Sequence, residues 1–351
     1  MNTQGSLIMM PLGVLYGVVT RARRAAYRNG IFTVYRLPAP VVSIGNITTG
    51  GTGKTPLVQW ICRALASDGK KVCVLTRGYG RINPETQVVV SDGTRVMAGE
   101  REAGDEPFLL ATNLVGVAAV VANADRVAAG QWAIQNLAAN ALVLDDGFQH
   151  LRIARNVDIV TIDATNPWGD GALLPHGRLR EEIDGLSRAH CVVITRSDQV
   201  ASVDELRKSI QNYTSAPVFT SRMITSVLKT IQGETVDESA LSTHSVAAFC
   251  GIGNPSSFYK HLQLAGARVV LTHAYGDHHI YHQLEIDRLV ERAKAAGATS
   301  LITTAKDAVK LDALRLDLPC YKLEIEIAID ESEQLLGLIR SRTVAGLGDS
   351  G

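Results

Sequence analysis

The chain has 351 residues, of which 46% are hydrophobic and 20% charged, and its 35 basic residues balance its 35 acidic ones. This composition fits a globular protein with room for two domains, and the lack of a basic excess argues against a nucleic-acid partner. The five cysteines are scattered without a C-x-x-C pair. They indicate buried thiols in a reducing compartment and argue against a disulfide framework or a zinc site.

The first expected element is a helix near the N-terminus. Residues 7–19 carry no charge, and Arg21, Arg23, Arg24 and Arg28 all follow them. The stretch is shorter than the ~20 apolar residues that cross a bilayer, and a signal peptide would carry its positive charge first. We therefore expect a helix that lies on the membrane surface and binds anionic lipid, with a buried core helix as the alternative.

Beyond residue 40, short β-branched stretches alternate with helical ones, which is typical of a parallel sheet covered on both faces. The polar, turn-rich region 212–243 suggests an antiparallel excursion, and the alternating pattern of 319–329 predicts a late strand. The other expected strands are 41–44, 71–75, 115–121, 141–144, 158–162, 191–195, 246–249, 267–271 and 300–303. The expected helices are 55–67, 106–113, 124–136, 255–265, 283–296 and 331–342.

The predicted fold class is α/β, with a P-loop NTPase-like parallel sheet, a second, smaller α/β lobe and an N-terminal membrane-associated helix. We expect three parts: the helix in 1–35, a nucleotide-binding lobe in 36–155, and a second lobe in 156–299 that closes the substrate cleft. Residues 300–351 are a candidate to complete the first lobe.

The sequence TTGGTGKTP, residues 48–56, follows an apolar stretch and precedes an amphipathic one. In a strand–turn–helix context, such glycines let backbone N–H groups and a helix N-terminus approach a phosphate chain. The lysine is placed to reach the β- and γ-phosphates, and the threonine after it to ligate Mg²⁺. The usual pattern has a glycine where this chain has a threonine, so the loop is a variant. The predicted ATP-binding residues are Thr48, Thr49, Gly50, Gly51, Thr52, Gly53, Lys54 and Thr55.

A second magnesium-side carboxylate is expected at the end of a neighbouring strand, and NALVLDDGFQH supplies Asp145 and Asp146 there. A helix cap and a turn residue are the alternative. The stretch Thr195–Asp198, TRSD, faintly resembles the guanine-specifying element of GTPases, but Arg196 replaces its lysine. We interpret it as a strand-end turn with an Asp cap, which favours ATP over GTP.

Several further stretches occur together in one order along the chain. With the phosphate loop and the N-terminal apolar–arginine stretch, they make residues 7 to about 310 resemble tetraacyldisaccharide 4′-kinase, the lipid A 4′-kinase of Gram-negative bacteria. The stretches are TRGYGR (76–81), GDEPFLLA (104–111), DDGFQH (145–150), LLPHGRLRE (173–181), FCGIGNP (249–255), GDHHIY (276–281) and TTAKDAVK (303–310).

The resemblance implies transfer of the γ-phosphate of ATP to the 4′-hydroxyl of a tetraacylated glucosamine disaccharide 1-phosphate, which gives lipid IVA. It implies a Mg²⁺-dependent enzyme, bound peripherally at the cytoplasmic face of the bacterial inner membrane, and two α/β lobes around a cleft. No obligate protein partner is expected.

The resemblance also implies roles for single residues. Asp105 in GDEP matches the general base, although Asp-Glu-Pro is equally a helix start. His278 is preferred over His279 as the partner of that base.

Arg180 and Glu181 are assigned to the disaccharide site, with Arg77 as a contributor, because arginine binds phosphate through a bidentate fork. Gln149 and His150 are candidates to bind sugar hydroxyls. Arg178 departs from the family pattern, so its role stays open. For the arginines assigned to this site, the alternative is a solvated charge cluster. Lys306 and Asp307 either face the nucleotide or form a structural ion pair.

Two other readings remain. A P-loop GTPase of the metal-chaperone or maturation type has a similar loop, but it has no use for a base dyad or an apolar N-terminal helix. A soluble small-molecule kinase would have the N-terminal helix in its core.

Overall fold

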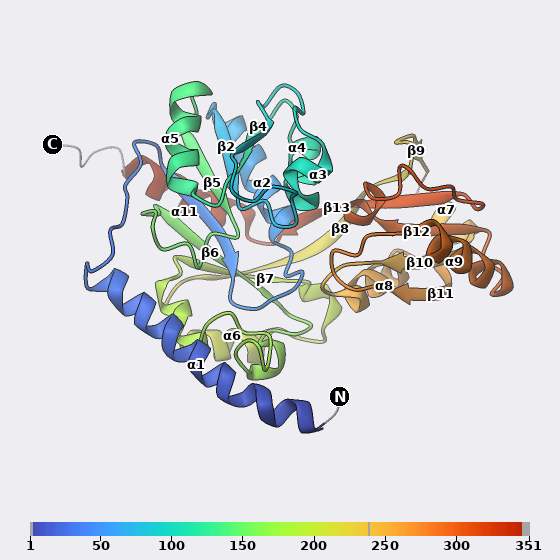
Figure 1. Ribbon diagram of the computed structural model, residues 1–351, viewed down its shortest axis with the longest axis horizontal. Coiled ribbons are helices and arrows are strands. Elements are labelled where there is room, and N and C mark those ends of the chain that lie inside the picture. Colours follow the sequence, from blue (N-terminus) through green and yellow to red (C-terminus); the bar gives the residue numbers. More distant parts are fainter. Residues whose placement is uncertain (1–2, 238, 346–351) are drawn as a thin grey trace. The chain divides into compact units, whose positions relative to one another are not determined.

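The computed structural model describes residues 3–237 and 239–345, and the side chains of residues 11–237 and 239–344. The chain forms two compact units (Figure 1). Unit 1 contains residues 1–222 and 329–351, and unit 2 contains residues 223–328. The α/β class with a sheet of mainly parallel strands is confirmed.

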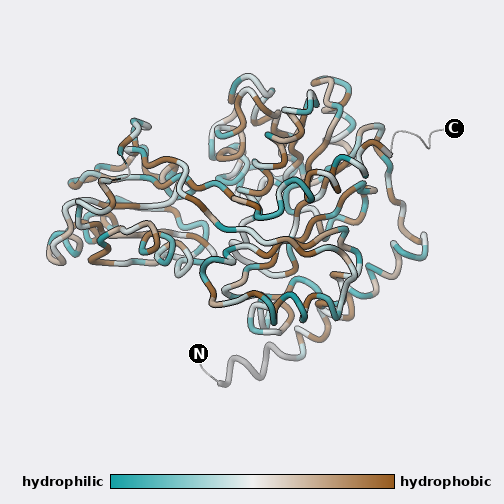
Figure 2. The backbone as a smooth tube through the Cα atoms, turned by 180° about the vertical axis from the view of Figure 1, so that it is seen from behind, coloured by the Kyte–Doolittle hydropathy of each residue, from teal (hydrophilic) through white to brown (hydrophobic). Residues whose placement is uncertain are grey.

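The sheet of unit 1 has the strand order β8-β7-β6-β1-β5-β2-β4-β3. All neighbours pair in parallel except β3, which is antiparallel to β4. Its central strands are entirely buried. Figure 2 shows many segments of this unit in the colour of hydrophobic residues. Strands buried on both faces read as continuous apolar stretches, which is why the sequence located them. The strands are β1 (Val41–Asn46), β2 (Val72–Thr76), β3 (Val88–Ser91), β4 (Ala118–Ala122), β5 (Ala141–Asp145), β6 (Val157–Asp163), β7 (Cys191–Thr195) and β8 (Val218–Thr230).

Most helices of unit 1 connect these strands, whereas α1 precedes β1 and α11 is the last element of the chain. In α2, the residues Leu57, Val58, Ile61, Cys62 and Leu65 recur at helical spacing and are all buried. The α-helices are α1 (Thr3–Arg28), α2 (Lys54–Ser67), α3 (Glu100–Ala103), α4 (Asp105–Asn113), α5 (Arg126–Asn136), α6 (Asp204–Gln211) and α11 (Ser332–Ala345). The 3-10 helices are η1 (Gly169–Gly171), η2 (Ile183–Arg188) and η3 (Ser197–Gln199).

Unit 2 contains the strand order β11-β10-β12-β13, with parallel pairing throughout. The predicted antiparallel excursion is present, because β9 pairs antiparallel with β8. The late strand is confirmed as β13. The elements are β9 (Thr235–Val236), α7 (Ala240–Thr243), β10 (Ser245–Cys250), α8 (Pro255–Leu264), β11 (Arg268–Ala274), α9 (Gln283–Ala295), β12 (Ser300–Thr304), α10 (Ala305–Ala308) and β13 (Cys320–Ile329).

The division between the units differs from the one expected near residue 156. The strand β6 pairs directly with β1, and β7 with β6, so residues 157–222 extend the sheet of unit 1. Only residues 329–351, and not the whole of 300–351, return to unit 1. An apolar strand has the same pattern in either unit, so the sequence did not distinguish these alternatives.

The helix α1 includes the expected N-terminal helix. Part of the apolar stretch 7–19 lies outside the residues whose side chains are described. In the described part, the exposed fractions are 47% for Leu12, 61% for Val14, 60% for Leu15, 48% for Val18 and 56% for Val19. The alternative of a buried core helix is therefore wrong for this stretch. Within the described residues, every helix is too short or too polar to cross a membrane.

Candidate active site

The phosphate loop joins β1 to α2 in unit 1. Gly50 and Gly53 have φ angles of 106° and 81°, in the left-handed region that favours glycine, and Gly53 is the N-cap of α2. Lys54 and Thr55 begin that helix, so they lie where a helix N-terminus attracts anions. The expected strand–glycine turn–helix context is confirmed.

Thr48 and Thr49 join the loop to a second segment of the unit. Thr48 forms an isolated antiparallel bridge with Leu179, and the Thr49 N–H donates to the carbonyl of Arg178 at 2.7 Å. The Arg180 N–H donates to the carbonyl of Ile47 at 2.7 Å. Thr48, which stands where the usual loop has its first glycine, and Thr49 therefore hold the predicted sugar-binding segment, residues 178–180, against the loop. This contact also gives Arg178 a backbone role.

A cluster of buried hydroxyl groups connects the phosphate loop to the strands of the sheet. The Thr52 Oγ1 atom accepts from Asn46 Nδ2 at 2.9 Å and lies 2.8 Å from Thr161 Oγ1. The hydroxyl of Thr195 donates to the Thr52 carbonyl at 3.0 Å. Because these four residues are at most 3% exposed, their hydrogen bonds fix the loop from three strands, β1, β6 and β7.

Asp145 ends β5 and is buried, and the Thr76 hydroxyl donates to its Oδ2 atom at 3.2 Å. Burial raises the pKa of Asp145 to about 7, with further contributions from the charges of Glu106 and Asp146, against the opposing charge of Lys54. The carboxyl group of Asp145 is therefore harder to ionise than that of an exposed aspartate.

Asp146 has a φ of 55°, and its carboxylate contacts two cations. Its oxygens lie 2.6 and 2.7 Å from Arg180 Nη1, and Oδ1 lies 3.4 Å from Lys54 Nζ. Burial opposes ionisation, but the charges of Lys54 and Arg180 outweigh it, so the pKa of Asp146 is lowered.

The residues predicted to hold Mg²⁺ fit that ion. Thr55, Asp145 and Asp146 offer oxygen ligands, which magnesium prefers. Burial is the largest cause of the raised pKa of Asp145, and a divalent cation bound beside this carboxylate would favour its ionised form.

Asp105 is the first residue of α4 and is 7% exposed. Its Oδ1 atom accepts from the Glu106 N–H at 2.9 Å. The preceding Gly104 has a φ of 91°, and a Cβ there would lie 2.5 Å from the Tyr79 carbonyl oxygen. The helix start expected from Asp-Glu-Pro is confirmed, but the N-cap is Gly104 and not Asp105. Gly104 packs the helix start against the TRGYGR turn that follows β2.

Glu181 and Gln149 lie in one buried network. Glu181 is 3% exposed and accepts from Gln149 Nε2 at 2.8 Å and from Arg188 at 2.9 and 3.2 Å. Gln149 Nε2 also donates to the carbonyl of Asn46 at 2.8 Å. The structure therefore brings these two predicted sugar-site residues together with the end of β1.

His150 is half-buried, and its Nε2 atom is buried without a hydrogen-bond partner among the described residues. Burial lowers its pKa to about 3, with further lowering by the charge of Arg126 and other arginines. The imidazole is therefore neutral near pH 7.

The two arginines of TRGYGR differ in their surroundings. Arg77 is exposed at the end of β2, whereas Arg81 is 6% exposed and donates to the carbonyls of Ala122 and Pro84 at 2.9 and 2.5 Å. Arg81 is thus structural, and Arg77 is the one available to a ligand.

Arg126 is a site residue that the sequence analysis missed. It is 7% exposed, and burial lowers its pKa, as does the charge of Arg77, while Asp146 and Asp145 raise it. Its position just after β4, at the carboxyl edge of the sheet, was the signal that could have identified it.

His278 belongs to unit 2, where it has a φ of 60°. Its Nε2 atom lies 3.3 Å from Lys306 Nζ, which is itself 3.2 Å from Asp277 Oδ1. The neighbouring His279 stacks on Tyr275 with ring centroids 4.6 Å apart. The two imidazoles thus have different surroundings, and the predicted partnership of His278 with Asp105 stays a prediction.

Asp307 has a structural role within unit 2. It is fully buried and accepts from the Gly251 N–H at 3.0 Å, the Tyr281 hydroxyl at 3.0 Å and the Thr304 hydroxyl at 2.7 Å. Its neighbour Lys306 contacts the His278 loop instead. Asp307 therefore ties the loop after β10 to the GDHHIY segment.

The TRSD stretch does not present a base-recognition element. Arg196 is 7% exposed, and its Nη1 atom lies 2.5 Å from the buried carboxylate of Asp163. Ser197 begins the 3-10 helix η3. This agrees with the strand-end turn expected from the sequence.

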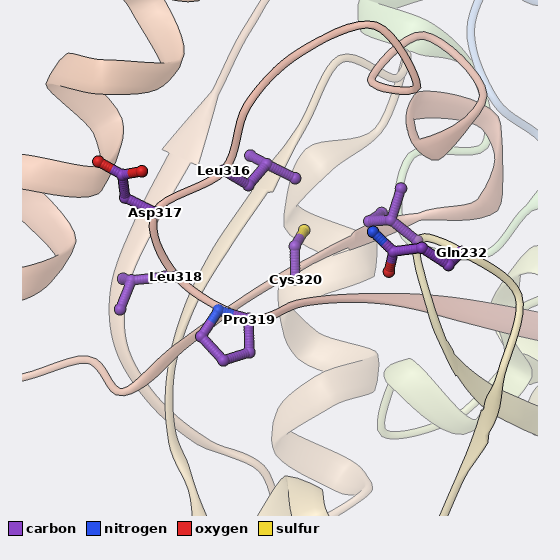
Figure 3. Close-up of a pocket in the computed structure, with 7 residues that line it drawn as sticks. Gln232, Leu316, Asp317, Leu318, Pro319 and Cys320 are labelled. Carbon is purple, nitrogen blue, oxygen red and sulfur yellow. The ribbon is translucent and has the colours of Figure 1, made fainter.

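A separate pocket of 330 Å³ lies in unit 2, lined by Ile231, Gln232 and residues 316–320 (Figure 3). Figure 3 shows Leu316, Leu318 and Pro319 around it, with Asp317 pointing to one side. None of the predicted site residues is among its lining.

Comparisons with known proteins identify the family of this chain. A family model described as tetraacyldisaccharide-1-P 4′-kinase matches residues 5–343. A tetraacyldisaccharide 4′-kinase of Geobacter metallireducens is 41% identical over 304 residues, or 87% of this chain and 88% of the relative. That of Desulfotalea psychrophila is 36% identical over 350 residues and 97% of each chain.

A solved structure supports the same assignment. A crystal structure of LpxK from Aquifex aeolicus in complex with ATP is 30% identical, with a TM-score of 0.76, and covers 95% of this chain and 98% of that one. Both the sequence and the fold are thus shared over nearly the whole length. The chain belongs to the tetraacyldisaccharide-1-P 4′-kinase family.

Proposed function

We propose that this chain transfers the γ-phosphate of ATP to the 4′-hydroxyl of tetraacyldisaccharide 1-phosphate and so forms lipid IVA. The observation that carries the proposal is the arrangement around Asp146, whose carboxylate contacts Lys54 of the phosphate loop and Arg180 of the predicted sugar segment. A nucleotide-binding group and an acceptor-binding group therefore meet at one residue, as a phosphotransferase requires.

The phosphate loop and Lys54 bind the triphosphate through backbone N–H groups, the helix terminus and the ammonium charge. Thr55, Asp145 and Asp146 would hold Mg²⁺, which when bound neutralises charge on the β- and γ-phosphates. The nucleotide is ATP rather than GTP, in line with the burial of Arg196 against Asp163.

In the transfer step, the 4′-oxygen forms a bond to the γ-phosphorus as the bond from that phosphorus to the β,γ-bridging oxygen breaks and ADP leaves. The hydroxyl proton passes to the carboxylate of Asp105, at the start of α4. His278 is proposed as the residue that orients or tunes this base.

The acceptor carries a 1-phosphate and sugar hydroxyls. We assign the phosphate to Arg180 and Arg77 because a guanidinium binds it through paired N–H groups. Gln149 and His150 follow the carboxylate pair directly and are assigned to the sugar. Glu181 supports this set from its buried position.

The acyl chains of this substrate stay in a bilayer, so the enzyme works at a membrane surface. The exposed apolar residues of α1 and the arginines after them fit the boundary between acyl chains and anionic headgroups. We place this surface at the cytoplasmic face of the inner membrane, where ATP is available.

The test is phosphate transfer from γ-labelled ATP to tetraacyldisaccharide 1-phosphate in mixed micelles, with wild type beside Lys54→Ala and Asp105→Asn. Magnesium-dependent labelling of the lipid that both substitutions reduce by at least about a hundredfold would support the proposal. GTP hydrolysis without lipid labelling would refute it and favour a nucleotide switch. Labelling of a water-soluble acceptor alone would favour a soluble small-molecule kinase.

A further inference from the structure

The helix α1 packs closely against the segment that leads to Arg180. A Cβ atom on Gly17 would lie 2.7 Å from Leu173 Cδ1, and one on Gly13 would lie 3.4 Å from the Leu173 carbonyl oxygen. These two glycines are one helical turn apart, so they form a continuous small-residue face. The helix can therefore approach the backbone of residues 173–180 more closely than it could with larger side chains at positions 13 and 17.

Tyr16 lies on this same face and reaches the segment with its hydroxyl. It donates a hydrogen bond of 2.8 Å to the carbonyl oxygen of Arg180, a residue 164 positions away in the chain. This bond is partly buried, so water competes poorly for the carbonyl.

Arg24, two turns further along, contacts the acidic residues that follow. Its guanidinium lies 2.9 and 3.1 Å from the two carboxylate oxygens of Asp184, and 3.5 Å from Oε2 of Glu181. The pairing with Asp184 is bidentate, the geometry in which an arginine fixes orientation as well as charge. Through Glu181 and Gln149, the contact continues to the carbonyl of Asn46 at the end of β1.

Arg180 is consequently held from three directions. Its N–H bonds to the carbonyl of Ile47 beside the phosphate loop, its own carbonyl accepts from Tyr16, and its guanidinium contacts Asp146. Only the second of these contacts comes from α1. The helix that exposes apolar side chains to the surroundings therefore also fixes a residue that contacts Asp146.

We propose that Tyr16 and Arg24 are positioning residues, through which α1 holds Arg180 and Glu181 in the geometry needed to bind the acceptor. The proposal rests on the function proposed above, and it adds that α1 is part of the acceptor site as well as a membrane contact. Displacement of α1 would then weaken use of the lipid substrate while leaving the nucleotide site unchanged.

The first test is Tyr16→Phe, which removes one hydroxyl and keeps the ring. We expect the KM for tetraacyldisaccharide 1-phosphate to rise about fivefold, as the loss of one hydrogen bond implies, with an unchanged KM for ATP. Binding to mixed micelles should stay the same because phenylalanine is no less apolar.

Tyr27→Phe is the matched control. It makes the same chemical change on the same helix, and within the described part of the chain its hydroxyl makes no hydrogen bond. Its kinetics should equal those of wild type. Arg24→Gln should raise the KM for the lipid, and Arg24→Lys should restore part of the loss because it keeps the charge without the bidentate geometry.

A double-mutant cycle with Arg180→Ala separates positioning from stability. If Tyr16 acts through the Arg180 side chain, adding Tyr16→Phe to Arg180→Ala should cause no further loss of kcat/KM. If the two substitutions lowered kcat/KM independently, so that their effects multiplied, and also lowered the Tm, the proposal would be overturned. Wild-type KM values in Tyr16→Phe would overturn it as well. A wild-type enzyme that labels no lipid would instead refute the proposed function itself.

Discussion

The buried hydroxyl cluster under the phosphate loop leads to a sharp prediction for Thr161→Val. The substitution keeps the shape of the side chain and removes the group that lies 2.8 Å from Thr52 Oγ1 and 3.2 Å from the carbonyl of Gly45. Two neutral hydrogen bonds are lost, and each contributes about 1 kcal/mol. We expect the free energy of unfolding to fall by about 2 kcal/mol.

About half of that loss should appear in nucleotide binding, because Thr52 is part of the loop that must stay in its anion-binding conformation. A difference of about 1 kcal/mol corresponds to a roughly fivefold rise in the KM for ATP. The KM for the lipid should not change. The assay is initial-rate phosphate transfer with ATP varied at saturating lipid, together with urea unfolding of the same preparation.

Two controls make the reasoning testable. Thr161→Ser keeps the hydroxyl and should stay near the wild-type KM for ATP. Thr303→Val makes the same change in a fully buried strand of unit 2, where the hydroxyl has no hydrogen-bond partner among the described residues, so it should not destabilise the protein. A folded Thr161→Val variant with the wild-type KM for ATP would refute the idea that this cluster organises the loop.

Three further results are expected. Asp163→Asn leaves Arg196 charged and buried without its carboxylate and should lower the free energy of unfolding by about 3 kcal/mol in urea titrations, whereas exposed Asp198→Asn should have almost no effect. The folded-state pKa of His150 is about 3, below its ordinary value of 6.5, so unfolding takes up a proton and the free energy of unfolding falls as the pH drops from 6.5 toward 3. His150→Gln should flatten that pH dependence in urea titrations at several pH values. An unchanged slope would contradict the assignment. Leu15→Asp places a charge on the exposed face of α1 and should weaken co-sedimentation with phosphatidylglycerol vesicles about tenfold at an unchanged Tm, and undiminished binding would exclude this face as the lipid contact.

The sequence predicted most of the strands because their burial on both faces leaves unbroken apolar stretches, as in β5 and β7. It was less informative where exposure varies along a strand. The strand β8 is buried at its start and mixed afterwards, so its residues read as a polar, turn-rich region. The helix α6 was missed because it has only one buried residue, Ile210.

The candidate site was predictable where a local motif carries it, as in the phosphate loop and the Asp145–Asp146 pair. It was not predictable where the contact depends on distant residues. The charged stretch with Arg180 and Glu181 would read from composition alone as a solvated cluster, yet Glu181 is buried among Gln149 and Arg188. Such burial is possible only because the partners arrive from other parts of the chain, and no local pattern records that.

The two adjacent aspartates show how one backbone angle divides chemical roles. In an ordinary extended strand, Asp145 and Asp146 would point to opposite faces of the sheet, but the left-handed φ of Asp146 ends the strand and redirects its side chain. Asp145 is buried and accepts a hydrogen bond from the Thr76 hydroxyl, whereas Asp146 lies between two cations. The pKa of the first is raised and that of the second lowered, although they are neighbours in the sequence.

The two carboxylates therefore cannot substitute for one another. Asp145 is buried and ionises less readily than an exposed aspartate, so a divalent cation bound beside it would stabilise its charged form. Asp146 already contacts both Lys54 and Arg180, so an anion that binds one of these cations changes the interaction of Asp146 with the other. Phosphates that bind at Lys54 would weaken the attraction between Lys54 and Asp146 and strengthen the ion pair between Arg180 and Asp146. Nucleotide and acceptor binding should thus be energetically linked through Asp146, the carboxylate that contacts both predicted binding groups.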